Sequence, residues 1–366
     1  MPAGMVPSTM TSLDIYVRDQ QLALARSIRH CKKVYLDLRY WLRLRDVTSG
    51  ALADPAWRSL LEKLQRAVRD GKAVCPIAES TFMELTKQSD PATRATTAQM
   101  VDSLSTGVAL LPIDWRTKTE IAHFFHTGMG TDLHPLANLM WTKLSYVLGF
   151  QHPSFAEIDS KFELEIQKRF FDKMWTITLA EMVETIGGES ADTSEAFERL
   201  AVRLNQENAA YAEELKSFSG TYKAEIRGVA SICAPIVAEV IEDISHKEGR
   251  AVPKRGSLEW CGNLRKWERY LQDAFMMPQT KLALRTMHIQ ACLHAHIRWD
   301  KKRQFEANDF YDFNHAAAAL GYCDAFFTER SLADLARRSN TALTAINGCR
   351  VTHRVEEAMA ILDGFA

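Results

Sequence analysis

Short apolar runs alternate with helical patterns over the first third of the chain. Residues 34–38, 73–77 and 108–113 are apolar and too short for buried helices, which predicts strands. Between them, residues 55–70 and 91–105 carry apolar side chains at helical spacing. This order of strand, helix, strand, helix, strand is typical of a parallel sheet with right-handed crossovers.

A second segment of the same kind lies near the C-terminus, at residues 309–330. Either Asn308 or Asp309 can cap a helix at its start, and a run of four alanines then lets this helix lie close to a sheet. Residues 325–327 then predict a short buried strand, whose polar exit carries Thr328 and Glu329. We expect this segment to complete the sheet that the first third begins.

The middle of the chain predicts helices alone. Helical periodicity with many charged positions covers residues 136–149, 157–186, 194–217 and 221–248. A block of this size must bury apolar faces of its own, so we expect an all-helical insertion that divides an α/β core. The predicted units are the first half of the core, the helical insertion and the second half of the core, at residues 1–115, 116–277 and 278–366.

Composition narrows the class of protein. With 46% hydrophobic and 25% charged residues, the chain is typical of a globular protein. The net charge of −1 gives no overall field that attracts nucleic acid, so such binding must come from local clusters. No apolar run is long enough to span a membrane and no signal-peptide pattern begins the chain. Seven cysteines without a C-x-x-C pair favour reduced thiols, and we expect a cytoplasmic location.

Two carboxylates follow the first two predicted strands. Asp37 interrupts an apolar run, and a buried charge is costly unless it is paired or bound to a metal; the alternative is a helix cap. Glu84 follows Ser80, which we expect to cap a helix at residues 81–87; the alternative for Glu84 is a solvated surface position. Because ligands of parallel sheets lie outside the carboxyl ends of the strands, acids gathered there are candidates for metal coordination.

Three stretches together resemble the PIN-like nuclease domain. In that family one acid ends the first strand, a second lies on a helix, and a third opens a helix of small residues before a strand that ends in Thr and an acid. Residues 33–41, 80–85 and 309–330 show these features in this order, and the spacing from Asp312 to Thr328 matches the family. The resemblance covers two stretches, roughly residues 30–115 and residues 280–366.

The resemblance implies a three-layer α/β/α parallel sheet and a nuclease that uses Mg²⁺ or Mn²⁺. In these roles Asp37 and Asp312 bind the metal directly. Glu84 binds the metal or its water, and Glu329 completes the set of acids. The chain departs from the family at the fourth acid, which often lies two residues after the Thr, where this chain has Arg330.

Three polar side chains accompany the acids. Asp309 is one turn before Asp312, so it either faces the site or caps its helix. His315 is three residues after Asp312 and either orients this acid or a scissile phosphate, or is a core histidine with satisfied hydrogen bonds. The resemblance gives Thr328 the role of holding a carboxylate or a water through its hydroxyl.

One part of the predicted insertion, residues 250–270, is both basic and aromatic. Cations hold phosphates and rings stack on bases, so this combination suits a polynucleotide. The alternative is a solvated helix face with tryptophans in the core. The candidate nucleic-acid contacts are Arg255, Arg265, Lys266 and Arg269.

Taken together, the motifs predict a metal-dependent endonuclease. RNA is the preferred substrate because many PIN-like domains are ribonucleases of toxin, RNA-processing or defence systems. Two alternatives stay open: a catalytically weak scaffold that binds RNA or protein, and a phosphohydrolase of small substrates. The helical insertion leaves room for a homodimer or a protein partner. No P-loop, dinucleotide-binding or serine-hydrolase motif is present.

Overall fold

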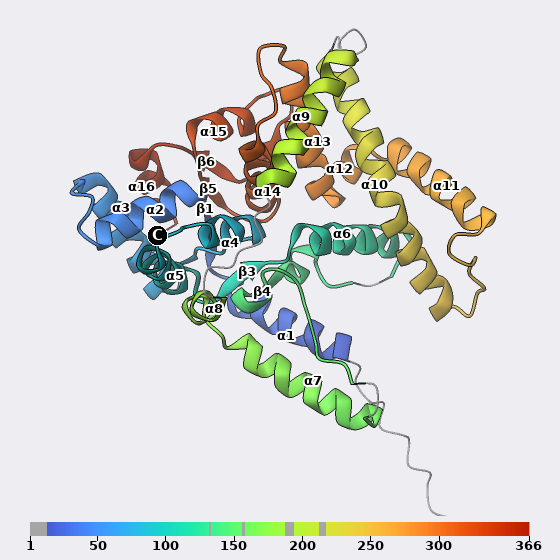
Figure 1. Ribbon diagram of the computed structural model, residues 1–366, viewed down its shortest axis with the longest axis horizontal. Helices are drawn as coiled ribbons and strands as arrows, with labels where there is room; N and C mark the ends of the chain where they lie inside the picture. The colour runs from blue at the N-terminus through green and yellow to red at the C-terminus, as the bar shows by residue number, and fades with distance from the viewer. Residues whose placement is uncertain (1–12, 132, 156–157, 187–193, 212–216, 366) are drawn as a thin grey trace, which may run out of the picture.

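The computed structural model describes residues 13–131, 133–155, 158–186, 194–211 and 217–365 (Figure 1). Most of these residues are helical, and the helices surround a small parallel sheet. The fold is therefore broadly α/β, as the sequence pattern predicts. Within these residues, no helix combines the length and the apolar character that a bilayer crossing requires.

Four parallel strands form the main sheet, in the order β2-β1-β5-β6. The C-terminal segment completes this sheet, as predicted, because β5 pairs directly with β1 and Leu36 lies opposite Phe327. Both strands therefore end at the same edge of the sheet. The strands are β1 (Lys32–Leu36), β2 (Ala73–Val74), β5 (Ala325–Phe327) and β6 (Arg350–Thr352).

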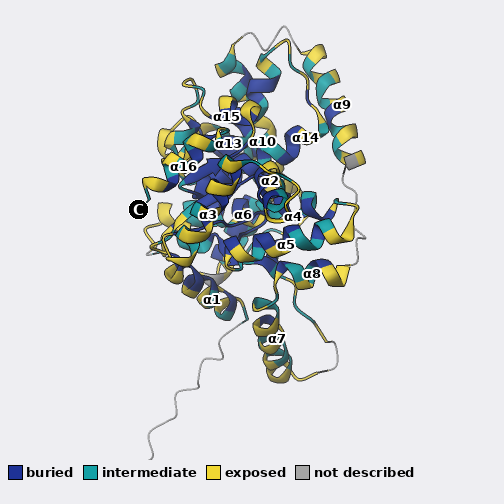
Figure 2. Ribbon diagram, turned by 90° about the vertical axis from the view of Figure 1, so that its left-hand side faces the viewer, coloured by how far each residue is buried: buried dark blue, intermediate teal, exposed yellow. Residues whose placement is uncertain are grey.

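Successive residues of the strands feed two apolar cores, one on each face of the sheet. Tyr35 and Phe326 belong to the first core, whereas Val34, Leu36 and Phe327 belong to the second. Figure 2 shows the buried residues gathered between the helices that cover these cores. Helices over the first core are α1 (Leu13–Ser27), α13 (Arg285–Trp299), α14 (Ala307–Tyr322) and α15 (Arg330–Ala336); those over the second are α2 (Leu38–Thr48), α3 (Pro55–Arg69), α5 (Pro91–Ser105) and α16 (Val355–Asp363).

The segment between the two halves of the core is not entirely helical. The prediction of a helix at residues 136–149 is wrong, because β4 (Trp141–Lys143) pairs antiparallel with β3 (Val108–Leu110). Strand β3 in turn contacts the β2 side of the sheet through a single bridge between Ile77 and Ala109. The partner that makes β4 a strand comes from tertiary structure, which the local spacing of apolar residues does not reveal. Two short 3₁₀ turns flank β4, η1 (Leu136–Leu139) and η2 (Leu144–Tyr146).

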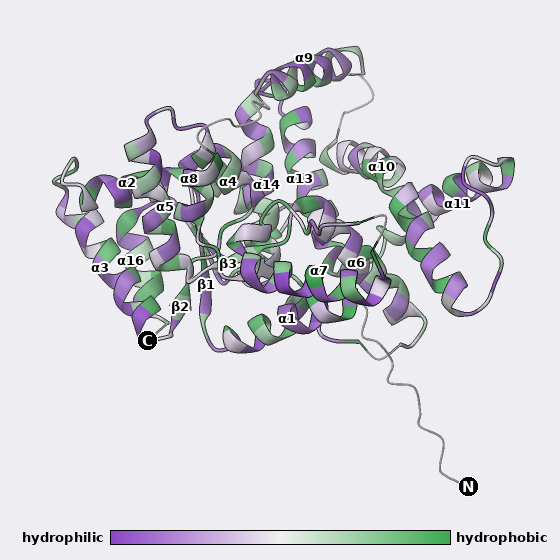
Figure 3. Ribbon diagram, turned by 60° about the horizontal axis from the view of Figure 1, so that its bottom comes forward, coloured by the Kyte–Doolittle hydropathy of each residue, from purple (hydrophilic) through white to green (hydrophobic). Residues whose placement is uncertain are grey.

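The other elements of this segment are helices. Helices α10 and α11 pack on each other, and α10 also packs on α13 and α6 (Figure 1). Hydrophilic and hydrophobic residues are interspersed along α9 and α11 in Figure 3, which is typical of helices with one packed face and one exposed face. The helices are α6 (Ile113–Gly128), α7 (Ser160–Trp175), α8 (Leu179–Ile186), α9 (Ser194–Ala210), α10 (Phe218–Lys247) and α11 (Leu258–Ala274), followed by α12 (Pro278–Ala283) and, near the C-terminus, the 3₁₀ turn η3 (Leu343–Ala345).

One strand end and one helix start differ from the sequence prediction. The first strand ends at Leu36, and Leu38 already begins α2, because the Asp37 side chain accepts a hydrogen bond from the Tyr40 amide. Helix α4 (Glu79–Thr86) begins after Ala78, so the prediction that Ser80 caps it is wrong. The Ser80 hydroxyl is instead buried and used in a contact with α14, described below.

Candidate functional site

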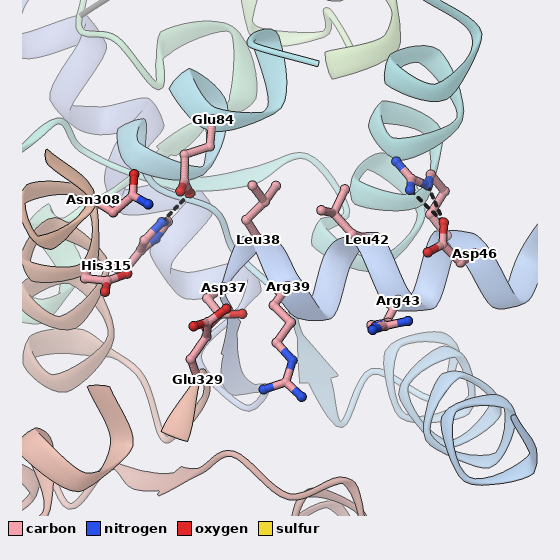
Figure 4. Close-up of a pocket in the computed structure, with 12 residues that line it drawn as sticks. Asp37, Leu38, Arg39, Leu42, Arg43, Asp46, Glu84, Asn308, His315 and Glu329 are labelled. Carbon is pink, nitrogen blue, oxygen red and sulfur yellow. Dashed lines mark hydrogen bonds and ion pairs between the residues drawn. The ribbon is translucent and has the colours of Figure 1, made fainter. Parts of the chain in front are cut away.

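A cavity of about 580 Å³ lies where β1 and β5 end (Figure 4). We call it the site cavity. Because β1 and β5 are parallel neighbours, the residues that follow them emerge side by side, and the Asp37 amide donates a hydrogen bond to the Phe327 carbonyl at 3.1 Å. All four acids predicted from the sequence line this cavity, although they come from separate segments: Asp37, Glu84, Asp312 and Glu329.

Asp37 is almost fully buried at the start of α2. One of its oxygens, Oδ1, accepts the Tyr40 amide at 3.3 Å, so the residue does cap the helix while it lines the cavity. Burial raises the pKa of its carboxyl to about 6; the Thr328 hydroxyl and His315 oppose the shift, and the Glu329 carboxylate adds to it. The helix cap and the site role are therefore compatible.

Asp312 lies on the second turn of α14 and faces the same cavity. Burial raises the pKa of its carboxyl to about 7, His315 opposes the shift, and the nearby carboxylates of Asp37 and Glu84 add to it. No hydrogen bond or ion pair to the Asp312 carboxyl occurs among the described residues. Two carboxyl groups that resist ionisation therefore lie near each other, on different elements.

Glu84 is held by a buried histidine. Its Oε2 lies 2.6 Å from Nε2 of His315 (Figure 4). The other ring nitrogen of His315, Nδ1, lies 2.8 Å from the Tyr35 hydroxyl and 3.0 Å from the Ser80 hydroxyl. Burial lowers the pKa of His315, but Tyr35 and Glu84 outweigh it and raise this pKa well above its ordinary value. We infer an imidazolium that donates one hydrogen bond to Glu84 and balances its charge.

The three accompanying residues have different surroundings. Asp309 closes a capping box with Glu306 and binds Arg303 Nη2 at 2.6 Å, so its oxygens serve the start of α14. It does not line the site cavity, although its charge raises the pKa of Asp312. Thr328 is fully buried, and its hydroxyl forms no well-aligned hydrogen bond among the described residues. The hydroxyl nevertheless lowers the pKa of the Asp37 carboxyl and so favours its charged form. His315 lines the site cavity and contacts the Glu84 carboxylate, as described above.

The predicted nucleic-acid contacts lie elsewhere. Helix α11 is at the opposite end of the molecule from α2 in Figure 1. The guanidinium of Arg255 binds carboxylates of α10, and the rings of Trp267 and Tyr270 pack on Phe125 of α6. These contacts agree with the alternative of a helix face over an aromatic core. The other three predicted contacts are exposed on α11: Arg265, Lys266 and Arg269. The structure does not bring these cations together with the acids of the site cavity.

Several residues of the site were not singled out by the sequence. Tyr35 is recognisable in the sequence only as an apolar strand residue, and its contact with His315 spans the sheet and α14. Arg39 and Arg43 line the site cavity from α2, as does Asn308 from α14. The signal available in advance was a pair of arginines four positions apart, directly after an acid at a strand exit.

The chemistry of the cavity suits a hard divalent cation. Its candidate ligands are carboxylate oxygens, and burial of Asp37 and Asp312 carries an electrostatic cost that a cation would relieve. Asp37, Asp312 and the exposed Glu329 are the residues that would hold it. Across the described ranges, however, no three His, Cys, Asp or Glu side chains are already arranged as a ligand group. The donor types fit a metal, and the arrangement shown is not a closed coordination shell.

Comparison with known proteins places this chain in no family. No protein-family model, no curated protein and no solved structure matches the chain.

Proposed function

We propose that the protein is an endonuclease that depends on Mg²⁺ or Mn²⁺ and hydrolyses phosphodiester bonds, with RNA as its preferred substrate. The observation that carries the proposal is the convergence of Asp37, Glu84, Asp312 and Glu329 on one cavity at the carboxyl ends of neighbouring parallel strands. The PIN-like three-layer core belongs to the same proposal, and apolar cores on both faces of the sheet support it. The preference for RNA comes from the family resemblance.

The residues of the site would act in three ways. Asp37 and Asp312 would hold the cation, and Glu329 would join them from the solvent side. When bound, a divalent cation lowers the pKa of water and stabilises charge that develops on a phosphodiester. His315 fixes Glu84 through Oε2, which leaves the other carboxylate oxygen for a water in the cavity.

Cleavage of a generic single-stranded RNA by the purified protein with Mn²⁺ tests the proposal. We expect Asp37→Asn and Asp312→Asn each to lower the rate about 100-fold or more, because each removes a charge that binds the cation. Asp334→Asn is the matched control, since Asp334 is an exposed carboxylate that pairs with Arg330 on α15. Cleavage at the native rate by both site variants would overturn the assignment of the site.

The ion pair between His315 and Glu84 favours a second candidate function. An internal cation already balances one of the four acids, which suits a catalytically weak PIN-like scaffold that binds RNA or protein. Binding of RNA without cleavage by the native protein would favour this scaffold. Hydrolysis of mononucleotides alone would favour a phosphohydrolase of small substrates.

A further inference from the structure

Helix α2 presents two arginines to the cavity that holds the acids. Arg39 and Arg43 are four positions apart, so they lie one turn apart on the same side of the helix. Both are exposed, and both line the site cavity. In Figure 4 they project from the side of α2 opposite to Leu38 and Leu42, in a row that begins near Glu329.

Neither the Arg39 nor the Arg43 guanidinium has a hydrogen-bonded or ion-paired partner among the residues that the structure describes. Arg45 provides the contrast, because it lines the same cavity but is bound by Asp46 at 2.6 Å and by Gln88 at 3.0 Å. The two free cations are therefore available to a ligand, whereas the third is used to hold the fold.

Their placement is unfavourable for the isolated helix. Like charges four positions apart repel each other, and Arg39 lies in the first turn, where the helix dipole favours an acid. The first turn of α2 contains no acidic side chain. Arg39 and Arg43 thus place positive charge on one side of α2, directly beside a cavity that four carboxylates also line.

We propose that Arg39 and Arg43 bind consecutive phosphates of a single-stranded polynucleotide, on one side of the phosphodiester that reaches the carboxylates. The inference rests on the proposed function and names its substrate class. A guanidinium group can donate two hydrogen bonds to the oxygens of one phosphate. With a rise of about 1.5 Å per residue, the Cα atoms of Arg39 and Arg43 are about 6 Å apart along the helix, which is comparable to the spacing of phosphates in an extended strand.

This arrangement distinguishes long substrates from short ones. A molecule with a single phosphodiester can reach Asp37 and Asp312 but has no further phosphate for the arginines. A polynucleotide can contact the carboxylates and the arginines of the cavity at once. The arginines also provide the local positive cluster that a chain of net charge −1 needs in order to hold a polyanion.

Fluorescence anisotropy with labelled twelve-nucleotide oligouridine and oligothymidine tests the inference. The full chain is kept in EDTA so that nothing is cut, and the two probes separate RNA from DNA. For the double variant Arg39→Ala, Arg43→Ala we expect about 10-fold weaker binding. The slope of log K against log salt should become shallower by about 1.4, because each lost phosphate contact on a single strand contributes about 0.7 to this slope.

Two variants serve as controls. Arg39→Lys, Arg43→Lys keeps both charges and should retain most of the salt dependence, which separates the loss of charge from a change in folding. Arg265→Ala, Lys266→Ala removes exposed cations of α11 and should bind as the native protein does.

The outcomes separate this inference from the proposed function. If the native protein and Arg39→Ala, Arg43→Ala bind the oligonucleotides with equal affinity and equal salt dependence, the inference is overturned, even if the protein cleaves RNA. Binding lost only in Arg265→Ala, Lys266→Ala would overturn it as well. Binding that depends on Arg39 and Arg43 without any hydrolysis would support the phosphate contacts and refute the nuclease.

Discussion

At the scale of single residues, the burial of the Asp37 and Asp312 carboxyls makes the stability of the protein depend on pH. Burial raises the pKa of the two carboxyls to about 6 and about 7, whereas the unfolded chain ionises near the ordinary value of 3.8. Between these values the folded state binds more protons than the unfolded state. The contribution of both groups to folding stability is therefore favourable at low pH and is lost as pH rises through 6 to 7.

Replacing both acids by asparagine should therefore stabilise the free protein at high pH. In EDTA at pH 8, we expect Asp37→Asn, Asp312→Asn to raise Tm by about 2–5 °C. Asparagine caps a helix as well as aspartate does, so the start of α2 should be preserved. At pH 5 the gain should vanish, because the native carboxyls are then protonated. Calorimetry at both pH values measures the effect, and a lower Tm for the variant at pH 8 would contradict it.

His315 provides a second prediction at this scale. Because Glu84 and Tyr35 raise its pKa, the imidazole should be doubly protonated at pH 7. Substitution of Glu84 by glutamine removes the carboxylate that favours the cation, so burial should then prevail and leave the imidazole neutral. NMR of the imidazole nitrogens at pH 7 distinguishes these forms. A neutral His315 in the native protein would rule out the inferred ion pair.

At the scale of elements, apolar runs predicted three strands of the main sheet, β1, β2 and β5. The run at residues 108–113 also contains a strand, β3, but this strand pairs antiparallel in the two-stranded sheet with β4. Strands that are buried on both faces do not alternate apolar and polar residues, so a short apolar run such as residues 325–327 is enough to predict a strand. Strand β4 could not be found this way, because its pairing with β3 depends on tertiary structure. The cap at Ser80 was wrong for a similar reason, since this hydroxyl is used by His315.

The candidate site was predicted in part, for physical reasons that differ between residues. Asp37 and Glu329 were found because acids at strand exits are unusual next to an apolar core. Arg39 and Arg43 were missed, because an exposed charge pair on a helix looks the same whether it binds water or a ligand. Only the cavity that they share with the carboxylates distinguishes them.

Helix α14 gives a prediction for an element. It carries Asp312 and His315, and its four alanines at positions 316–319 are completely buried. Ala317→Leu should therefore force α14 away from its neighbours and destabilise the protein by about 1–3 kcal/mol. Urea unfolding measures this loss, with Ala92→Leu on the exposed side of α5 as the control. Equal stability of the two variants would show that the packing around Ala317 can accommodate a larger side chain.

At the scale of the whole molecule, the sheet brings residues far apart in the sequence to one place. The first third supplies Asp37, Glu84 and the arginines of α2, and the C-terminal segment supplies Asp312 and Glu329. Helices α10 and α11 lie at the other end of the molecule (Figure 1), so they are outside the site cavity. The nuclease proposal needs both halves of the core and makes no use of the basic set on α11.

The most direct measurement is a crystal structure of the protein soaked in Mn²⁺, with anomalous scattering used to locate the metal. We predict one anomalous peak in the site cavity, within about 2–2.5 Å of oxygens of both Asp37 and Asp312. The same soak of Asp37→Asn, Asp312→Asn should show no peak there. A native cavity without manganese at saturating concentration, or manganese bound only elsewhere, would contradict the account.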